Sequence, residues 1–261
     1  MGVLNVTPDS FSDGGLYEDV SAAVARAREM TDEGADLIDV GGESTRPGAE
    51  PVDTDTEIAR TAPVIEEIAS LGPRISIDTR KAVVAKAALD AGATIVNDIS
   101  GGTFDPELLP LVADRGADVI LMHMRGTPET MDDLTEYTDL VGDVWAELAE
   151  RVRAAEAAGV DRERNWVDPG LGFAKTAEQS LELVQRIDEL RHAGRPLVVG
   201  PSRKRFVGQA LGGAPADDRV EGTAAVVAWL ASRGVEVVRV HDVRVMRRVV
   251  DTIAAIAGAG S

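Results

Sequence analysis

The sequence has no cysteine among its 261 residues, which excludes disulfide bonds, a thiolate nucleophile and a cysteine-ligated zinc site. It also has no apolar run approaching the roughly 20 residues that a membrane-spanning helix needs. No basic segment followed by an apolar stretch stands at its start, as a secretory signal peptide would require. We therefore expect a cytoplasmic protein with no membrane partner.

Positive charge is scarce. There are 27 Lys and Arg against 45 Asp and Glu, a net charge of −18, and the only lysines are Lys81, Lys86, Lys175 and Lys204. A general nucleic-acid-binding role is disfavoured, because such proteins carry a basic surface. Two explanations of the acidity stay open. One is an ordinary acidic enzyme from a GC-rich gene, and the other is a protein of a halophile, whose acidic surface keeps it in solution at high salt.

Short apolar segments alternate with amphipathic helical patterns along the whole chain. Strands are predicted at 2–6, 35–40, 74–78, 94–98, 118–122, 165–168, 196–199 and 235–240. Helices are predicted at about 19–34, 54–71, 81–91, 106–115, 139–158, 179–192, 221–233 and 244–257. Near-continuous Val, Ile and Leu strands separated by helices are typical of a parallel sheet covered on both faces.

Eight such units, in a length close to the roughly 250 residues of a (β/α)8 barrel, predict an α/β fold. We expect a single-domain TIM barrel over residues 1–261. The alternative is a doubly wound open sheet. The loop after the first strand lacks the G-x-G-x-x-G spacing, so the dinucleotide-binding version of that fold is not supported.

Polar residues stand at the carboxyl ends of the predicted strands, where such barrels build their active sites. Asp78, Asn97 and Asp168 each end an apolar run, where an unpaired carboxylate would be costly. They are suited to a planar, nitrogen-rich ligand, whose paired N–H groups a carboxylate accepts bidentately. Lys204 could then hold a ring carbonyl or ring nitrogen. Asp39 and Asp98 fit equally well as caps of the following helices.

A second set of residues suits an anion and a hard cation. It comprises Asn5, Thr45, Arg46, Arg239 and His241. The loops after strands seven and eight commonly supply the phosphate site of these barrels, and here they contain Lys204, Arg239 and His241. Asn5 alone is too little for a metal cage, so any Mg²⁺ would be held mainly by ligand phosphates and water.

The loops at 7–15 and 41–53 are long, polar and contain glycine. Loops of this length in a compact domain are usually functional or disordered. We expect both to close over the mouth of the barrel as lids.

Eight segments together resemble the dihydropteroate synthase family of pterin-binding (β/α)8 enzymes. One follows each predicted strand, in the family's order: GVLNVTPDSFSDGG, IDVGGESTRPGA, SIDTRKAVVA, VNDISGG, LMHMRGTP, WVDPGLGFAKT, GPSRKRF and RVHDV. The resemblance implies a transferase of folate biosynthesis with Mg²⁺ as cofactor. It would condense 6-hydroxymethyl-7,8-dihydropterin diphosphate with 4-aminobenzoate to give 7,8-dihydropteroate and diphosphate. It also implies a homodimer, and a segment before the first strand that this sequence lacks.

The resemblance also implies roles for individual residues. The pterin would be held by Asp78, Asn97, Met122, Asp168 and Lys204. The diphosphate would be held by Thr45, Arg46, Arg239 and His241, with Asn5 as the protein ligand of Mg²⁺. The aminobenzoate site would be shaped by Pro47, Phe173, Ser202 and Arg203. The groups expected to act in catalysis are Asp78, Asp168, Lys204 and Arg239, through charge and positioning, because no protein nucleophile is required.

Two rival functions remain. A methyltetrahydrofolate-dependent corrinoid methyltransferase would share the pterin acceptors but has no use for the diphosphate set. A non-catalytic paralogue would bind pterin without turnover.

Overall fold

Eight short strands form the centre of the protein in the computed structural model, which describes residues 1–7, 16–44, 51–191 and 194–259. They are β1 (Gly2–Asn5), β2 (Leu37–Gly41), β3 (Arg74–Asp78), β4 (Ile95–Asp98), β5 (Asp118–Met122), β6 (Asn165–Asp168), β7 (Val198–Val199) and β8 (Val237–Val238). All eight predicted strands are present. Three have the predicted bounds, and the other five differ at their ends.

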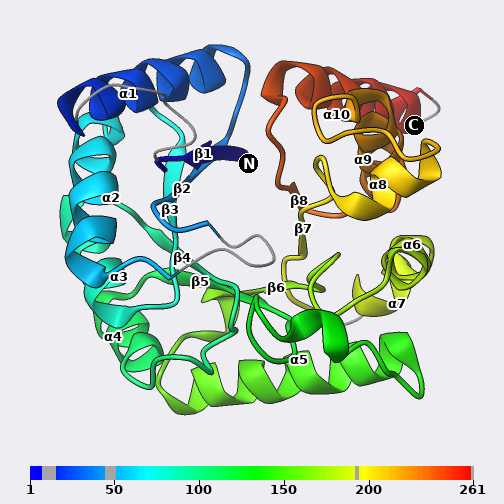
Figure 1. The fold of residues 1–261 in the computed structure, drawn as a ribbon, viewed down its shortest axis with the longest axis horizontal. Coiled ribbons are helices and arrows are strands. Elements are labelled where there is room, and N and C mark those ends of the chain that lie inside the picture. Colours follow the sequence, from blue (N-terminus) through cyan, green and yellow to red (C-terminus); the bar gives the residue numbers. More distant parts are fainter. Residues whose placement is uncertain (8–15, 45–50, 192–193, 260–261) are drawn as a thin grey trace.

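Helices surround the strands as a ring (Figure 1). Within the described residues they are α1 (Leu16–Asp32), α2 (Thr54–Ile68), α3 (Ala82–Ala91), α4 (Leu108–Arg115), α5 (Leu140–Ala157), α6 (Ala177–Gln185), α7 (Ile187–Arg191), α8 (Arg205–Ala210), α9 (Val220–Ser232) and α10 (Val243–Gly258). Two features differ from the prediction. The single helix predicted at 179–192 is interrupted at Arg186, and α8 follows β7 where the sequence predicts no helix.

The strands close into a barrel. β1 to β6 pair in chain order as one parallel sheet, and β7 pairs with β8. Two narrow seams join these parts: the Val3 N–H donates to the Val240 carbonyl at 2.9 Å, and the Val167 N–H donates to the Pro196 carbonyl at 3.0 Å. The result is the predicted (β/α)8 barrel, and the open sheet is excluded.

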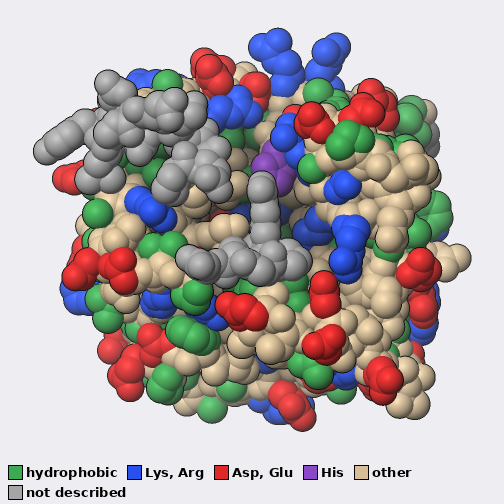
Figure 2. Space-filling model, viewed as in Figure 1, with side chains coloured by type: hydrophobic (Ala, Val, Ile, Leu, Met, Phe, Trp, Pro, Cys, Tyr) green, Lys and Arg blue, Asp and Glu red, His purple; other side chains and the backbone are tan. Residues whose placement is uncertain are grey.

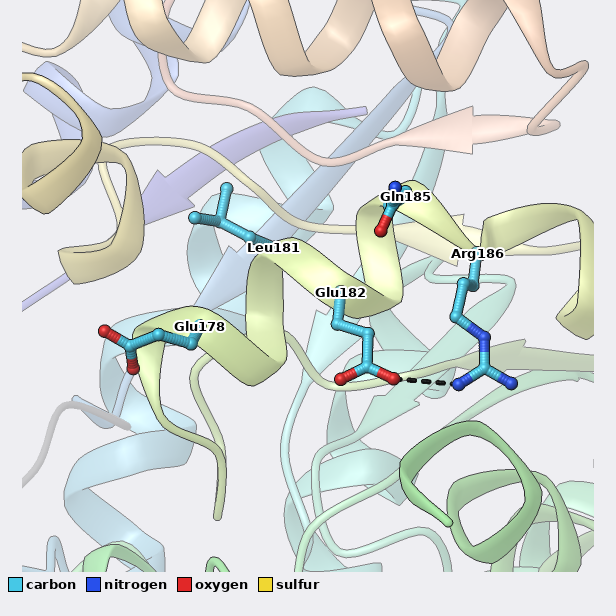
Figure 3. A pocket seen from close by; sticks show the side chains of 5 residues that line it. All are labelled: Glu178, Leu181, Glu182, Gln185 and Arg186. Carbon is cyan, nitrogen blue, oxygen red and sulfur yellow. Dashed lines mark hydrogen bonds and ion pairs between the residues drawn. The ribbon is translucent and has the colours of Figure 1, made fainter.

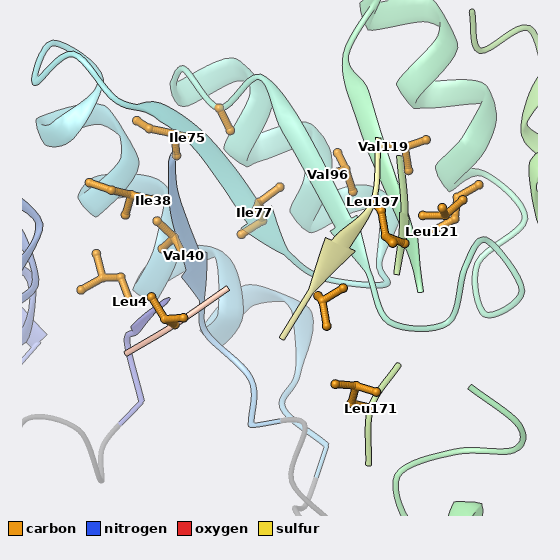
Figure 4. Close-up of a cluster of buried hydrophobic side chains, with 14 of the residues drawn as sticks. Leu4, Ile38, Val40, Ile75, Ile77, Val96, Val119, Leu121, Leu171 and Leu197 are labelled. Carbon is orange, nitrogen blue, oxygen red and sulfur yellow. The ribbon is translucent and has the colours of Figure 1, made fainter. Parts of the chain in front are cut away.

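Most buried apolar side chains belong to two of three clusters, and the third, at Met122, Met124 and Ala174, is small. The largest cluster lies between strands and helices (Figure 4) and includes Leu4, Ile38, Val40, Ile77, Val96 and Leu121. A smaller cluster fills the inside of the barrel with Met1, Leu37, Ile95, Ile120 and Val198. None of the helices in the described ranges is long and apolar enough to cross a membrane.

Candidate active site

The barrel's interior changes from apolar to polar towards the carboxyl ends of its strands. Asp39 and Asn97 stand two residues after Leu37 and Ile95, which are members of the interior apolar cluster. Asp168 and Arg239 stand two residues after Trp166 and Val237, which pack on that cluster. Strand side chains alternate between the two faces, so residues two apart point the same way. This alternation brings the predicted acceptors together at one mouth.

Arg239 is the centre of a buried cluster of charged and polar groups. Its Nε donates to Asp39 Oδ2 at 2.6 Å, and its Nη2 donates to Asp78 Oδ2 at 2.7 Å. Asn97 Nδ2 also donates to Asp39 Oδ2, at 3.0 Å. Asp39 is completely buried, and its Oδ1 has no hydrogen-bond partner among the described residues. Asp39 therefore belongs to the mouth and is not a helix cap.

Asp98, the other residue left open by the sequence, has a local role. Its carboxylate accepts from the Ser100 N–H and hydroxyl, both at 2.7 Å, and from the Gly102 N–H at 2.6 Å. These bonds stabilise the turn after β4.

Burial shifts the protonation of the cluster. It raises the pKa of Asp78 to about 7, opposed by the neighbouring Arg239 cation and assisted by the Asp39 carboxylate. The pKa of Arg239 is raised despite its own burial, because the Asp39 and Asp78 carboxylates favour the cation. The cluster therefore keeps a permanent positive charge on Arg239 beside Asp78, a carboxyl whose ionisation depends on pH near neutrality.

Asp168 and Lys204 form the other side of the mouth. Asp168 Oδ1 accepts from the Gly170 N–H at 2.7 Å, and burial raises the pKa of this carboxyl while Lys204 opposes the shift. Burial lowers the pKa of Lys204 to about 8. Lys204 Nζ donates to the Leu171 carbonyl and lies 4.6 Å from the centre of the Phe173 ring. A cation and an aromatic ring from neighbouring loops thus meet beside Asp168.

The remaining predicted residues lie around this centre where the structure describes them. His241 Nδ1 is 3.0 Å from Ser202 Oγ, and Arg203 forms a two-point ion pair with Asp242 at 3.0 and 2.6 Å. Met122 is buried at the end of β5. Thr45, Arg46 and Pro47, and most of the 7–15 loop, fall outside the described residues. Figure 2 shows Lys, Arg and His side chains near the middle of this face.

The mouth offers little for a metal ion beyond the predicted amide. No group of three or more His, Cys, Asp or Glu in the described ranges could hold a metal. Asn5, partly exposed at the end of β1, supplies one amide oxygen. One protein oxygen fits Mg²⁺ well, because this ion usually keeps several waters and takes its other ligands from substrate phosphates.

One group of ion pairs near the mouth was not predicted from the sequence. Lys81, before α3, joins both sides of the segment 45–50: its Nζ donates to Glu43 at 2.5 Å and to the Val52 carbonyl at 2.6 Å, and it also pairs with buried Glu57 at 2.6 Å. Lys81 and the acids Glu43 and Glu57 are visible in the sequence, but they are 38 and 24 residues apart. Only the fold brings them together.

The surface hollow in Figure 3 lies elsewhere, on the outer side of α6. Its lining residues are Glu178, Leu181, Glu182, Gln185 and Arg186. Arg186 is already paired with Glu182 at 2.8 Å and Glu189 at 2.7 Å. Because none of the residues at the strand ends lines it, we do not assign this hollow to the active site.

The chain is similar to known proteins along nearly its whole length. The family model described as pterin binding enzyme matches residues 1–241. The chain is 48% identical over 250 residues to the dihydropteroate synthase of Synechocystis, over 95% of this chain and 86% of that protein.

Two solved structures of Xanthomonas albilineans dihydropteroate synthase are also similar. The one with 4-aminobenzoic acid has a TM-score of 0.93 and 42% identity, covering 99% of this chain and 92% of that one. The complex with 7,8-dihydropteroate has a TM-score of 0.89 and 39% identity, covering 99% and 93%. Both similarities extend over nearly the whole chain.

Proposed function

Because the chain belongs to the dihydropteroate synthase family of pterin-binding enzymes, we propose that the polar mouth of its barrel carries out the family's reaction. The enzyme is a transferase of folate biosynthesis. It condenses 6-hydroxymethyl-7,8-dihydropterin diphosphate with 4-aminobenzoate to give 7,8-dihydropteroate and diphosphate. The observation that carries the residue assignment is the meeting of Asp78, Asp168, Lys204 and Arg239 at one mouth.

The pterin occupies the side formed by Asp78, Asn97, Asp168 and Lys204, with Met122 in its apolar lining. Its guanidine-like edge presents neighbouring N–H donors, which suit buried carboxylates that the protein alone pairs incompletely. The pKa of Asp78 near 7 supports this assignment, because a ligand donating N–H groups to the carboxylate would compensate for its burial.

The diphosphate occupies the side formed by the loops after β7 and β8. Arg239 and His241 supply donors there, and Thr45 and Arg46 are assigned to the same anion by the family motif. Asn5 would hold Mg²⁺, which when bound neutralises part of the charge of the leaving diphosphate.

The reaction needs no protein nucleophile. The C–O bond of the pterin methylene breaks and diphosphate leaves with the electron pair. The neutral amine of 4-aminobenzoate forms the new C–N bond and releases one proton. Asp78 and Asp168 stabilise the positive charge that develops on the pterin side, and Arg239 stabilises the departing anion.

The aminobenzoate enters from the side of Phe173, Ser202 and Arg203, with Pro47 as a further wall. Ser202 and Arg203 are fixed by His241 and Asp242, residues that follow β8.

A homodimer is the second part of the proposal. Trp229 on α9 and Val245 and Ile256 on α10 are exposed apolar side chains on outer helices, with 41, 42 and 66% of their surface accessible. Sedimentation of the purified protein at several concentrations tests this state, and a monomer at all of them would refute it.

Diphosphate release tests the function. We expect release from the dihydropterin diphosphate that depends on both 4-aminobenzoate and Mg²⁺. The methyltransferase and the non-catalytic paralogue both predict pterin binding without release, and that result would overturn the proposal. Running the assay in dilute and molar KCl tests the halophile explanation, which predicts higher activity in molar salt.

A further inference from the structure

A row of three polar residues, of which Lys175 and His123 are buried and Glu147 is partly exposed, begins in the loop that joins β6 to α6. Lys175 Nζ is 2.9 Å from His123 Nδ1, and His123 Nε2 is 3.0 Å from Glu147 Oε2 on α5. Lys175 is among the largest fully buried side chains in the described ranges, and His123 is completely buried. The reaction as proposed uses none of the three.

The protonation of this row follows from its contacts. Burial, and after it the neighbouring Lys175 and Arg151, lower the pKa of His123 to about 2, so the imidazole is neutral. Burial also lowers the pKa of Lys175 well below its ordinary value. A lysine nitrogen can donate through N–H, so His123 Nδ1 is the acceptor and its Nε2–H donates to the Glu147 carboxylate. The row therefore has one consistent direction, and Lys175 keeps further N–H groups for other partners.

Lys175 uses one of these N–H groups to hold the loop itself. Its Nζ donates to the Phe173 carbonyl at 2.9 Å, and the next carbonyl, of Ala174, accepts from Tyr137 OH at 2.9 Å. Ala174 has φ +51°, a left-handed backbone conformation that is unfavourable for a residue with a Cβ. Such conformations persist where the surroundings enforce them, and they are frequent at functional sites.

The contacts form a closed ring. Arg125 stacks on Tyr137 at 3.9 Å from the ring centre, and its Nη2 pairs with Glu147 at 2.6 Å. Glu147 leads back through His123 to Lys175. The strained segment is thus held from two directions by groups that also hold each other.

The Phe173 side chain connects this ring of contacts to the proposed site. The ring of Phe173 lies under Lys204 Nζ, 4.6 Å from it. We propose that Lys175 is a positioning residue: together with His123 and Tyr137 it fixes the Phe173–Ala174 backbone, and thereby the place of the Phe173 ring on the aminobenzoate side of the site. The kinetic part of this inference rests on the proposed function.

The first test is kinetic and uses Lys175→Met, with Lys86→Met as the matched control on the exposed face of α3. We expect KM for 4-aminobenzoate to rise about ten- to hundred-fold in Lys175→Met, the scale on which a misplaced contact acts. The Kd of the dihydropterin diphosphate, titrated without aminobenzoate, should change less than about threefold. Lys86→Met should leave both values unchanged.

Tyr137→Phe removes a single hydroxyl from the same loop and covers the case in which Lys175→Met does not fold. It should raise the same KM by a smaller factor and leave the pterin Kd unchanged. If both variants fold, the rise in KM in the double variant should be smaller than the product of the two single rises, because both substitutions act on one segment. Loss of pterin affinity by the same factor as aminobenzoate affinity, or unchanged KM in both variants, would overturn the proposal.

The second test is spectroscopic and independent of turnover. With four lysines in the chain, selective ¹³Cε labelling gives few signals, and each can be assigned by substitution. The Lys204 ε-methylene should resonate upfield, because of the Phe173 ring, and should move towards the ordinary lysine position in Tyr137→Phe and Lys175→Met. If the Lys204 signal stays at its wild-type position in both variants, the positioning role is refuted. If the Lys204 signal moves in the variants but the wild-type protein releases no diphosphate, the positioning role is supported and the proposed function is refuted.

Discussion

Replacing Arg239 with methionine should destabilise the folded protein strongly, and the loss should increase with pH. Arg239 contacts Asp39 and Asp78 at 2.6 and 2.7 Å, and both carboxylates are at least nine-tenths buried. Methionine retains much of the apolar length of the side chain but leaves both acids without the cation. The variant therefore isolates the charge.

The magnitude follows from the burial of the partners. Removing one member of a buried ion pair costs about 3–5 kcal/mol of unfolding free energy, because the other charge stays buried without compensation. Here the removed member serves two acids, so we expect a loss at the upper end of that range. Removing a surface cation that has two acidic partners should cost under about 1 kcal/mol of unfolding free energy.

The pH dependence comes from Asp78. Its folded pKa, about 7, lies above its unfolded value of 3.8, so the contribution of this group to stability is fully present below pH 3.8 and is lost as pH rises towards 7. Without Arg239, which opposes the shift, the folded pKa rises further. As pH rises above 7, the wild-type protein therefore loses no further unfolding free energy through Asp78, whereas the variant continues to lose it. Over 1.5 pH units the difference grows by up to about 2 kcal/mol, at about 1.4 kcal/mol for each unit.

Urea denaturation followed by circular dichroism at pH 6.0, 7.0 and 8.5, at one fixed salt concentration, checks both parts. The matched control is Arg247→Met on α10, since Arg247 also pairs with two acids, Asp251 at 2.9 Å and Asp36 at 3.3 Å, but is 41% exposed. A loss below about 1.5 kcal/mol for Arg239→Met, or the same loss at pH 6.0 and 8.5, would refute the reasoning.

Four further predictions concern the site. Asp78→Asn should weaken binding of the dihydropterin diphosphate about ten- to hundred-fold in a calorimetric titration, the value of a hydrogen bond to a charged group, and retained affinity would remove Asp78 as the acceptor. The value of kcat/KM should rise with pH through about 7, as Asp78 ionises, and fall above about 8, as Lys204 loses its proton; Lys204→Arg should abolish the fall, and an unchanged profile would assign the basic limb elsewhere. Asn5→Ala should raise the Mg²⁺ concentration required for half-maximal diphosphate release, and an unaltered requirement would exclude Asn5 as a ligand. Gly170→Ala should abolish folding, because its Cβ would lie 2.0 Å from the His123 carbonyl oxygen at φ +66°; Gly116→Ala, at φ +58° with nothing within 4 Å of the new carbon, should cost only about 1–2 kcal/mol in a denaturation curve.

Much of the barrel was predictable because its signals are local. An apolar run of strand length followed by a helical pattern was repeated eight times, and every strand was found. The interruption between α6 and α7 was missed because the apolar spacing continues across Arg186 with no glycine or proline to mark a break. The short α8 was missed because its residues belong to a motif that looks like a loop.

The site was predictable only in part, because its pairings are not local. Asp78, Asn97 and Asp168 were identified since polar residues ending an apolar strand need a partner. The bond that joins Asp78 to Arg239 spans 161 residues of the chain and depends on closure of the barrel. Lys175 has the charge and the glycine-rich neighbourhood of an exposed loop residue, so nothing in the sequence indicated that it would be buried.

The two seams of the barrel divide the site by charge as well as by structure. The acceptors Asp39, Asp78, Asn97 and Asp168 all come from the six-stranded sheet, whereas Lys204 and Arg239 follow the separate pair β7–β8. The acidic and basic halves of the mouth are thus carried by two pieces that few backbone hydrogen bonds join. A pterin diphosphate whose ring contacts one half and whose phosphates contact the other would link the six-stranded sheet to the β7–β8 pair. The contacts that bind the substrate would then also stabilise the closed barrel.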